Sequence, residues 1–269
     1  MTFFLPIFKA MSVVGITGLV IGIILGIAGK LLAVKEDLRV RGVRDLLPGS
    51  NCGGCGFTGC DALAVAIVAG QAPISACAAA FSNHEQIASV IGQSTEKSVR
   101  KIAIVHCAGT CDKTKLKYNY SGLSDCRKVS VVPGAGEKIC TKGCLGFGSC
   151  TKVCSKNAIN IVNGVAVVDH NLCMGCGACA KICPNGLIEI ISEKARYSVQ
   201  CSSIETGKNV RTACDVGCIG CKICVKNCES QAITVENNLA KINQELCTGC
   251  GKCAEKCPRH IIFKLPLSV

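Results

Sequence analysis

The sequence predicts an α+β protein built from small, cysteine-rich units behind an apolar N-terminal helix. Three observations carry this prediction: an uncharged apolar run near the N-terminus, four cysteines close behind it, and a pattern of eight cysteines that occurs twice. The chain has 269 residues, of which 25 are cysteine and only 4% are aromatic. Because so few aromatic side chains limit a conventional core, we expect bound metal to supply much of the folding free energy.

The apolar run covers residues 10–29, about the 20 residues that a helix needs to cross a bilayer. A cleaved signal peptide is the alternative, but residues 1–6 have no basic side chain and Gly29-Lys30 does not resemble a cleavage site. We therefore expect a single-pass anchor in the cell membrane. Only Lys9 precedes the run, and five basic residues follow it: Lys30, Lys35, Arg39, Arg41 and Arg44. By the positive-inside rule, the rest of the chain faces the cytoplasm.

Three glycines in this run, Gly18, Gly22 and Gly26, recur every four residues and share one helix face. Small residues let a second helix approach closely, so this face is one candidate for packing against a partner membrane subunit. The alternative is that glycine is simply common in membrane helices.

Eight cysteines recur at a constant offset of 74 residues, which indicates that each copy builds the same metal sites. The first copy comprises Cys140, Cys144, Cys150, Cys154, Cys173, Cys176, Cys179 and Cys183, and the second comprises Cys214, Cys218, Cys224, Cys228, Cys247, Cys250, Cys253 and Cys257. The second half of each copy reads Cys-x2-Cys-x2-Cys-x3-Cys-Pro. In bacterial ferredoxins, three cysteines of this run hold one [4Fe-4S] cluster and the fourth reaches a second cluster.

The stretches between the cysteines predict β-hairpins. Residues 159–162 and 165–168 are β-rich and are joined at Asn163-Gly164, a strong hairpin signal. Residues 232–242 repeat the pattern with Asn237-Asn238 at the turn. Each copy is thus a cysteine loop, a helix, a hairpin, and another cysteine loop and helix, which resembles the bacterial two-cluster ferredoxin domain.

This resemblance implies four ligand sets. In the second copy they are Cys218, Cys221, Cys224 and Cys257, and Cys228, Cys247, Cys250 and Cys253; in the first copy Cys154, Cys173, Cys176 and Cys179 form a complete set. The remaining set, Cys144, Cys150 and Cys183, is one ligand short because Phe147 stands where the second copy has Cys221. We expect Cys140 to replace it, with a three-iron cluster as the alternative. Ser155 and Glu229 also stand where such domains usually have proline.

Ahead of the repeat, Cys52, Cys55 and Cys60 lie within nine residues, and Cys77 follows a helix-like segment over residues 61–69. These four cysteines suit another iron-sulfur cluster, with a structural zinc ion as the alternative.

Five cysteines remain: Cys107, Cys111, Cys126, Cys201 and Cys214. We expect a sixth cluster on the first three, with Cys201 or Cys214 as fourth ligand; a zinc site or unligated thiols is the alternative. Cys107 and Cys201 each follow a short apolar stretch, at residues 102–105 and 197–199, and could approach each other from adjacent strands.

The net charge of +12 does not indicate nucleic acid. An oxidised [4Fe-4S] cluster with four thiolates carries about −2, so six would contribute about −12 and offset this excess. The odd cysteine count and the cluster spacings argue against a disulfide framework and indicate a reducing cytoplasm. The sequence has no dinucleotide fingerprint, Walker loop or catalytic histidine grouping, so we expect it to move electrons.

The order of membrane helix, four-cysteine site and tandem ferredoxin units resembles the B subunit of the Rnf complex, the membrane ferredoxin:NAD oxidoreductase that pumps ions. The resemblance implies that reduced soluble ferredoxin donates electrons, and that the clusters pass them to membrane and flavin-bearing partner subunits. The alternatives are a polyferredoxin subunit of another membrane redox enzyme, such as a hydrogenase or quinone-linked dehydrogenase, and a zinc-stapled binding module.

The expected organisation is an anchor at 1–34, an iron-sulfur domain at 35–100, a cysteine-rich connection at 101–139, ferredoxin-like units at 140–195 and 214–269, and a linker with Cys201 at 196–213. Basic residues lie between the last cysteines, where they could attract an acidic ferredoxin: Lys222, Lys226, Lys252, Lys256 and Arg259.

Overall fold

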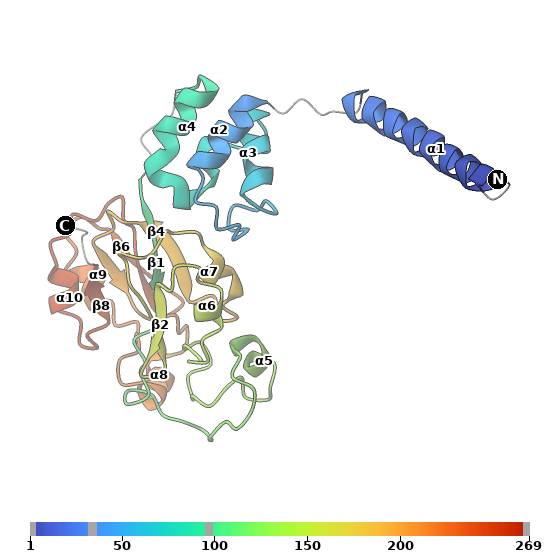
Figure 1. Cartoon of the computed structure of the whole chain (residues 1–269). Helices are drawn as coiled ribbons and strands as arrows, with labels where there is room; N and C mark the ends of the chain where they lie inside the picture. Colours follow the sequence, from blue (N-terminus) through green and yellow to red (C-terminus); the bar gives the residue numbers. More distant parts are fainter. Residues whose placement is uncertain (1–3, 32–36, 95–98, 266–269) are drawn as a thin grey trace. The chain divides into compact units, whose positions relative to one another are not determined.

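The computed structural model describes residues 4–31, 37–94 and 99–265 (Figure 1). The chain separates into two compact units, Met1–Val40 and Arg41–Val269, which are described separately. Lys35 and the expected boundary between residues 34 and 35 lie outside the described residues, as do residues 266–269 of the second ferredoxin-like unit.

The first unit contains the long helix α1, Phe4–Leu31. Its segment Met11–Lys30 has 20 residues with a mean hydropathy of 2.4, and none of it is buried against the chain. An apolar helix without a covering partner suits a lipid environment, and this segment is long enough to span it. Apart from the adjacent residues and the backbone of α1 itself, no atom of the described residues lies within 4 Å of a Cβ built on Gly18, Gly22 or Gly26, so the shared glycine face is open.

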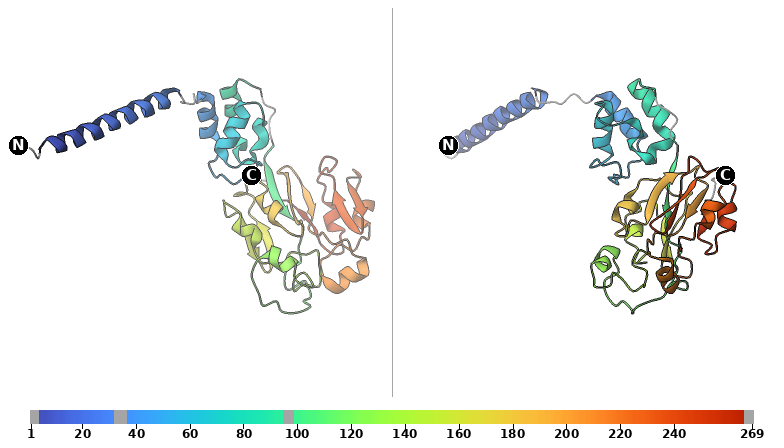
Figure 2. Two further views of the ribbon diagram at one scale, coloured as in Figure 1. Left: turned by 90° about the vertical axis from the view of Figure 1, so that its right-hand side faces the viewer. Right: turned by 180° about the vertical axis from the view of Figure 1, so that it is seen from behind.

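The second unit begins at Arg41, within the helix Leu38–Leu46, and its first part is a small helical domain. This domain includes α3, which confirms the helix expected near residues 61–69. Its side chains pack around a core that includes Val43, Leu63 and Ile87, each at most 1% exposed. Figures 1 and 2 show α2, α3 and α4 gathered together. The elements of this domain are α2 Leu38–Leu46, α3 Cys60–Val68, the short 3-10 helices η1 Ile74–Ala76 and η2 Ala78–Asn83, and α4 His84–Ile91.

Two similar halves follow. The first contains β1 Lys101–Val105, α5 Cys126–Ser130, α6 Ser149–Lys152, β2 Ile159–Val162, β3 Val165–Val168, α7 Ala178–Ile182 and β4 Ile188–Ser192. The second contains β5 Tyr197–Val199, α8 Gly207–Ala213, α9 Ile223–Lys226, β6 Ile233–Glu236, β7 Leu239–Ile242, α10 Lys252–Glu255 and β8 Ile262–Lys264. The order of loops, helices and hairpins confirms the predicted fold class.

Both predicted hairpins are present. Strands β2 and β3 pair antiparallel, as do β6 and β7. The turn residues Asn163, Gly164, Asn237 and Asn238 all have positive φ, as a two-residue hairpin turn with the twist of the strands requires.

Each half is closed by a second two-stranded sheet that the sequence did not predict. Strand β1 pairs antiparallel with β4, and β5 pairs antiparallel with β8. In each half, the last strand therefore lies beside the first. The apolar cores of both halves are interleaved with cysteines, as where Ile159 and Leu187 pack with Cys150. The apolar side chains and the thiols are therefore buried together in the same cores.

Candidate metal centres

The structure gathers all but one of the 25 cysteine thiols into six groups of four. We number the sites in the order in which they adjoin one another. Site 1 is Cys52, Cys55, Cys60 and Cys77; site 2 is Cys154, Cys173, Cys176 and Cys179; site 3 is Cys126, Cys144, Cys150 and Cys183; site 4 is Cys107, Cys140, Cys201 and Cys214; site 5 is Cys218, Cys221, Cys224 and Cys257; site 6 is Cys228, Cys247, Cys250 and Cys253. The remaining cysteine is Cys111, which is exposed.

Site 1 belongs to the helical domain. Cys52 and Cys55 lie in the loop before α3, Cys60 is the first residue of α3, and Cys77 lies between η1 and η2. The side chain of Asn51 accepts a hydrogen bond from the backbone N–H of Cys60 at 2.8 Å, which fixes the loop against the helix start. The four thiols line a cavity of about 280 Å³ whose wall also includes a cysteine of site 2.

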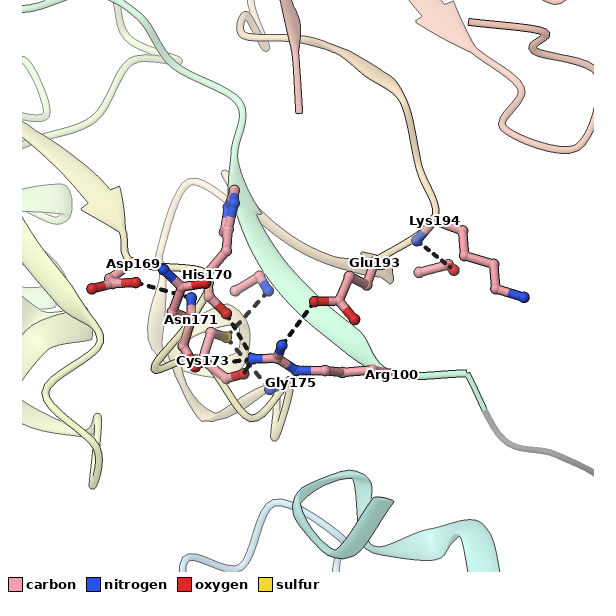
Figure 3. A network of polar contacts seen from close by, with 10 residues as sticks. Arg100, Asp169, His170, Asn171, Cys173, Gly175, Glu193 and Lys194 are labelled. Carbon is pink, nitrogen blue, oxygen red and sulfur yellow. Dashed lines mark hydrogen bonds and ion pairs between the residues drawn. The ribbon is translucent and has the colours of Figure 1, made fainter. Parts of the chain in front are cut away.

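An arginine holds the loop of site 2 in place (Figure 3). The Arg100 guanidinium donates to the carbonyl oxygens of His170, Asn171 and Cys173 at 2.8, 3.1 and 3.0 Å. It also forms an ion pair with Glu193 at 2.8 Å, with both side chains less than a third exposed. A planar, always charged donor can satisfy several carbonyls at once, so Arg100 fixes the backbone that carries the site 2 ligands.

Backbone N–H groups point at the sulfurs of site 2. Those of Ala103 and Gly175 donate to the Sγ of Cys173 at 3.4 Å, and that of Ala158 donates to the Sγ of Cys154 at 3.3 Å. Such bonds stabilise negative charge on sulfur and tune the reduction potential of a bound cluster.

Site 3 obtains its fourth cysteine from the short helix α5. The backbone N–H of Cys126 donates to the buried hydroxyl of Ser149 at 2.8 Å, and Asp125 caps α5 by accepting a backbone N–H at 2.9 Å. Phe147, at the position of the missing ferredoxin ligand, packs edge-on against Tyr120 with ring centroids 5.2 Å apart. An aromatic pair thus occupies the place of the usual ligand, and the α5 segment supplies another.

Site 4 is formed jointly by the two halves. Cys107 and Cys201 each lie two residues beyond a strand, β1 and β5, and the chain segments there are joined by a 3.0 Å hydrogen bond from Ala108 N to Gln200 O. Cys140 and Cys214 come from equivalent positions of the cysteine repeat. The four thiols line a cavity of about 300 Å³.

The backbone around site 4 has an approximate two-fold relation. The N–H of Cys144 donates to the Sγ of Cys107 at 3.3 Å, and the N–H of Cys218 donates to the Sγ of Cys201, also at 3.3 Å. Each half therefore contributes two cysteines to site 4. One sulfur of each pair accepts a hydrogen bond from the backbone of a cysteine in the adjoining site, 3 or 5.

Sites 5 and 6 repeat the arrangement of sites 3 and 2. Helix α9 contains Cys224 of site 5, and Cys228 of site 6 follows just after it. Helix α10 contains Cys253 of site 6, and Cys257 of site 5 follows just after it. The N–H of Ala232 donates to the Sγ of Cys228 at 3.3 Å, as its counterpart does in site 2. This reproduces the crossover of a two-cluster ferredoxin.

Burial disfavours the ionised form of the cysteines at these sites. Burial is the main cause that raises the pKa of Cys179 to about 12 and those of Cys150, Cys201 and Cys224 to about 11, and neighbouring thiolates raise them further. Four sulfurs so placed hold negative charge only beside positive charge. Within the described ranges no three His, Cys, Asp or Glu side chains converge closely enough to hold one metal ion. Four thiols around a larger space suit a [4Fe-4S] cluster.

The structure corrects two expected groupings. Cys140 was expected to complete the set now called site 3, but Cys126 takes that place and Cys140 lines site 4. Cys107, Cys111 and Cys126 were expected to share one cluster, with Cys201 or Cys214 as fourth ligand, but the structure separates these three. Cys107 lines site 4 together with both Cys201 and Cys214, Cys111 is exposed, and Cys126 lines site 3. The reason is that α5 folds back onto the loop before α6, which its sequence position does not reveal.

The five basic residues expected at a docking surface fall into two groups. Lys222, Lys226 and Lys256 are exposed and have no ion pair among the described residues. Lys252 is paired with an exposed glutamate, and Arg259 donates to two backbone carbonyl oxygens beside sites 4 and 5 at 2.6 and 3.3 Å. Arg259 thus supports the ligand loops.

Consecutive sites adjoin one another. A Cβ built on Gly54, in the site 1 loop, would lie 2.5 Å from the carbonyl oxygen of Cys176 in site 2, and Lys181 Nζ donates to Gly54 O at 3.1 Å. Sites 2 and 3 share helices α6 and α7, and sites 5 and 6 share α9 and α10. The hydrogen bonds to the sulfurs of Cys107 and Cys201 connect sites 3, 4 and 5.

Family models match three parts of the chain. An Fe-S cluster model matches residues 47–79, a 4Fe-4S binding domain matches residues 166–189, and a 4Fe-4S dicluster domain matches residues 217–262. These matches cover site 1 and parts of both ferredoxin-like units. The fold and the cysteine sites therefore define an iron-sulfur electron-transfer protein with several clusters and, among the described residues, one apolar helix long enough to cross a membrane.

Related proteins identify the family. The chain is 41% identical to the B subunit of the ion-translocating oxidoreductase complex of Methanosarcina acetivorans, over 94% of this chain and 97% of the relative. It is 43% identical to the B subunit of the Na⁺-translocating ferredoxin:NAD⁺ oxidoreductase complex of Acetobacterium woodii, over 93% and 76%. For the corresponding B subunit of the proton-translocating complex of Clostridium ljungdahlii the identity is 39%, over 93% and 89%. The chain belongs to the family of B subunits of the ion-translocating oxidoreductase (Rnf) complexes, and serves such a membrane complex in electron transfer.

Proposed function

We propose that the chain accepts electrons from reduced soluble ferredoxin and carries them through six [4Fe-4S] clusters, one at each site, to partner subunits that lead to NAD. The observation that carries this proposal is the unbroken succession of six four-cysteine sites. A bound cluster accepts and releases one electron at a time. The protein's own part is to hold the sulfurs, exclude water from them and direct N–H groups at them.

The charge distribution supports entry of electrons at sites 5 and 6. Lys222, Lys226 and Lys256 are exposed around these sites and unpaired among the described residues, so they are available to an acidic partner. Complementary charge increases the rate of encounter, and salt screens it. Site 1, which is nearest in sequence to α1, is then the exit toward membrane and flavin-bearing subunits.

The printed names of the relatives support a division of labour. One relative at 43% identity is named for Na⁺ translocation and another at 39% identity for proton translocation. Because similar B subunits accompany different ions, we assign ion selectivity to other subunits of the complex. This chain then supplies electrons only.

The anchor supports placing all six sites in the cytoplasm. The described basic residues after the apolar run are Lys30, Arg39, Arg41 and Arg44. Such an excess marks the cytoplasmic flank of a membrane helix.

Iron and acid-labile sulfide per chain, measured on anaerobically purified protein, test the cluster count. About 24 iron atoms correspond to six four-iron clusters, and about 16 to 20 would remove one or two sites from the relay. EPR spectra recorded during stepwise addition of reduced ferredoxin test the donor, since cluster signals grow only if ferredoxin reduces them. A form with the three exposed lysines changed to glutamine should be reduced more slowly at low salt and at a similar rate at high salt. An unchanged rate at low salt would refute the docking surface.

A further inference from the structure

Lys138 is a buried cation without a carboxylate partner. Its residue is only 3% exposed, and its Nζ donates to the carbonyl oxygens of Gly109 and Gly164, both at 2.9 Å. No Asp or Glu of the described residues lies within ion-pair distance of it. A buried ammonium left uncompensated is strongly destabilising, so some other negative charge must lie close to Lys138.

One acceptor of this lysine lies against site 4. A Cβ built on Gly109 would be 3.4 Å from the Sγ of Cys214 and 3.7 Å from that of Cys107. Lys138 itself is two residues before Cys140, a third member of site 4. Its ammonium is therefore hydrogen-bonded to a residue that lines the cavity of this site.

The other acceptor faces the loop of site 3. A Cβ on Gly146 would lie 2.9 Å from the carbonyl oxygen of Gly164, so these two loops touch. Gly146 is two residues after Cys144 of site 3, so the carbonyl that binds the Lys138 ammonium lies against a site 3 loop as well.

The ferredoxin-like arrangement does not itself require this lysine. The cysteine repeat places Thr212 at the equivalent position of the second half. Thr212 is exposed, and its hydroxyl bonds to the carbonyl oxygen of Asn209 in its own helix. The buried cation is therefore specific to the first half, where the two halves join through site 4.

We propose that Lys138 is a fixed cation that stabilises the reduced clusters of sites 3 and 4 and so raises their reduction potentials. The inference rests on the proposed function, because the negative charge that compensates Lys138 is that of the clusters. Each cluster gains one negative charge on reduction, so a nearby cation favours the reduced form. Lys138 is a positioning residue in this role. It ligates no iron, but its charge favours the presence of electrons on the clusters of sites 3 and 4, where the two halves meet.

The test is an EPR-monitored redox titration of the full chain with all clusters loaded. Lys138→Met and Lys138→Gln remove the charge, while Lys138→Arg keeps it. Lys115→Met is the matched control, since Lys115 lies in the same segment but is exposed. In both neutral variants the ratio of reduced to oxidised cluster at a fixed potential should fall about tenfold for two transitions, a shift of about 59 mV for one electron. Lys138→Arg and the control should leave these transitions close to their original positions.

Each outcome bears on one claim. Unmoved transitions in an iron-replete neutral variant would refute the proposed role of Lys138 while leaving the relay intact. Loss of iron in both neutral variants would assign Lys138 to cluster assembly and also overturn the tuning role. Low iron in the unmodified chain would instead count against the proposed function itself. A Cys214→Ala background identifies site 4, because one of the two shifted transitions should vanish there.

Discussion

Replacing Cys126 with alanine is expected to remove one ligand from site 3 and to leave the other five sites complete. The thiol of Cys126 lines the same small cavity as Cys144, Cys150 and Cys183, and its backbone is fixed by the Ser149 hydroxyl. No other cysteine lines that cavity. Site 3 of the variant therefore has three thiols and no substitute ligand.

The magnitude follows from the ligand count. If all six sites are filled, the unmodified chain is expected to hold about 24 iron atoms, and each lost cluster removes about four. Cys126→Ala should therefore hold about 20 iron atoms, or about 23 if the three remaining thiols retain a three-iron cluster. Cys140→Ala should give the same iron loss from site 4 instead, and Cys111→Ala should keep all the iron.

The assay combines iron and sulfide analysis with EPR of the oxidised and reduced forms. The three single variants and one double variant are sufficient. Because Cys126 and Cys140 belong to different sites, their double variant should lose the sum of the two single losses, which is about eight iron atoms if both clusters are lost entirely. If the two cysteines instead served one site, the double variant would lose no more than each single variant. That result, or an iron loss in Cys111→Ala, would refute the grouping.

Three further predictions follow. Gly54→Ala should slow electron passage between sites 1 and 2 at constant iron content, because its Cβ would collide with the carbonyl oxygen of Cys176. The measurement is stopped-flow reduction. The control is Gly143→Ala, whose Cβ would make ordinary contacts of 3.5 Å or more. Arg100→Gln should accelerate chelator-driven iron loss, since it breaks charge-assisted bonds worth roughly 1.5–3 kcal/mol each to the site 2 loop. Burial raises the pKa of Cys179 to about 12, against about 8.5 in the unfolded chain. Any structure that the iron-free chain retains should therefore be more stable to urea at pH 7 than at pH 10. An equal loss of stability between these pH values in the iron-loaded chain would contradict this reasoning.

The parts that the sequence predicted correctly depend on local spacing. The hairpin turn at Asn163-Gly164 needs only its own two residues to adopt positive φ. The grouping of the thiols at sites 2, 5 and 6 follows from short cysteine loops with the ferredoxin spacing. The apolar run of α1 is likewise a local signal.

Sites 3 and 4 were predicted only in part, because Cys126 and Cys140 join the other cysteines through long-range folding. Cys126 reaches site 3 only because α5 folds back against the loop before α6. A usable signal for site 4 was nevertheless present. Cys140 and Cys214 are equivalent in the repeat, and the second half already has two complete sets without Cys214. Equivalent cysteines that are both unnecessary to the ferredoxin sites are expected to share a site of their own, and Cys107 with Cys201 completes it.

Site 4 also affects the distance between the clusters of the two halves. Two ferredoxin units joined by a flexible linker would have a variable distance between their clusters, and electron passage across the gap would vary with it. Here residues 196–213 are not a bare linker, since they contain β5, Cys201 and α8. Neither half holds more than two cysteines of site 4, so a cluster can assemble there only when both halves have folded and docked. A cluster bound there would therefore both fix the distance between the halves and carry the electron across it, which makes assembly of the junction a condition for a continuous relay.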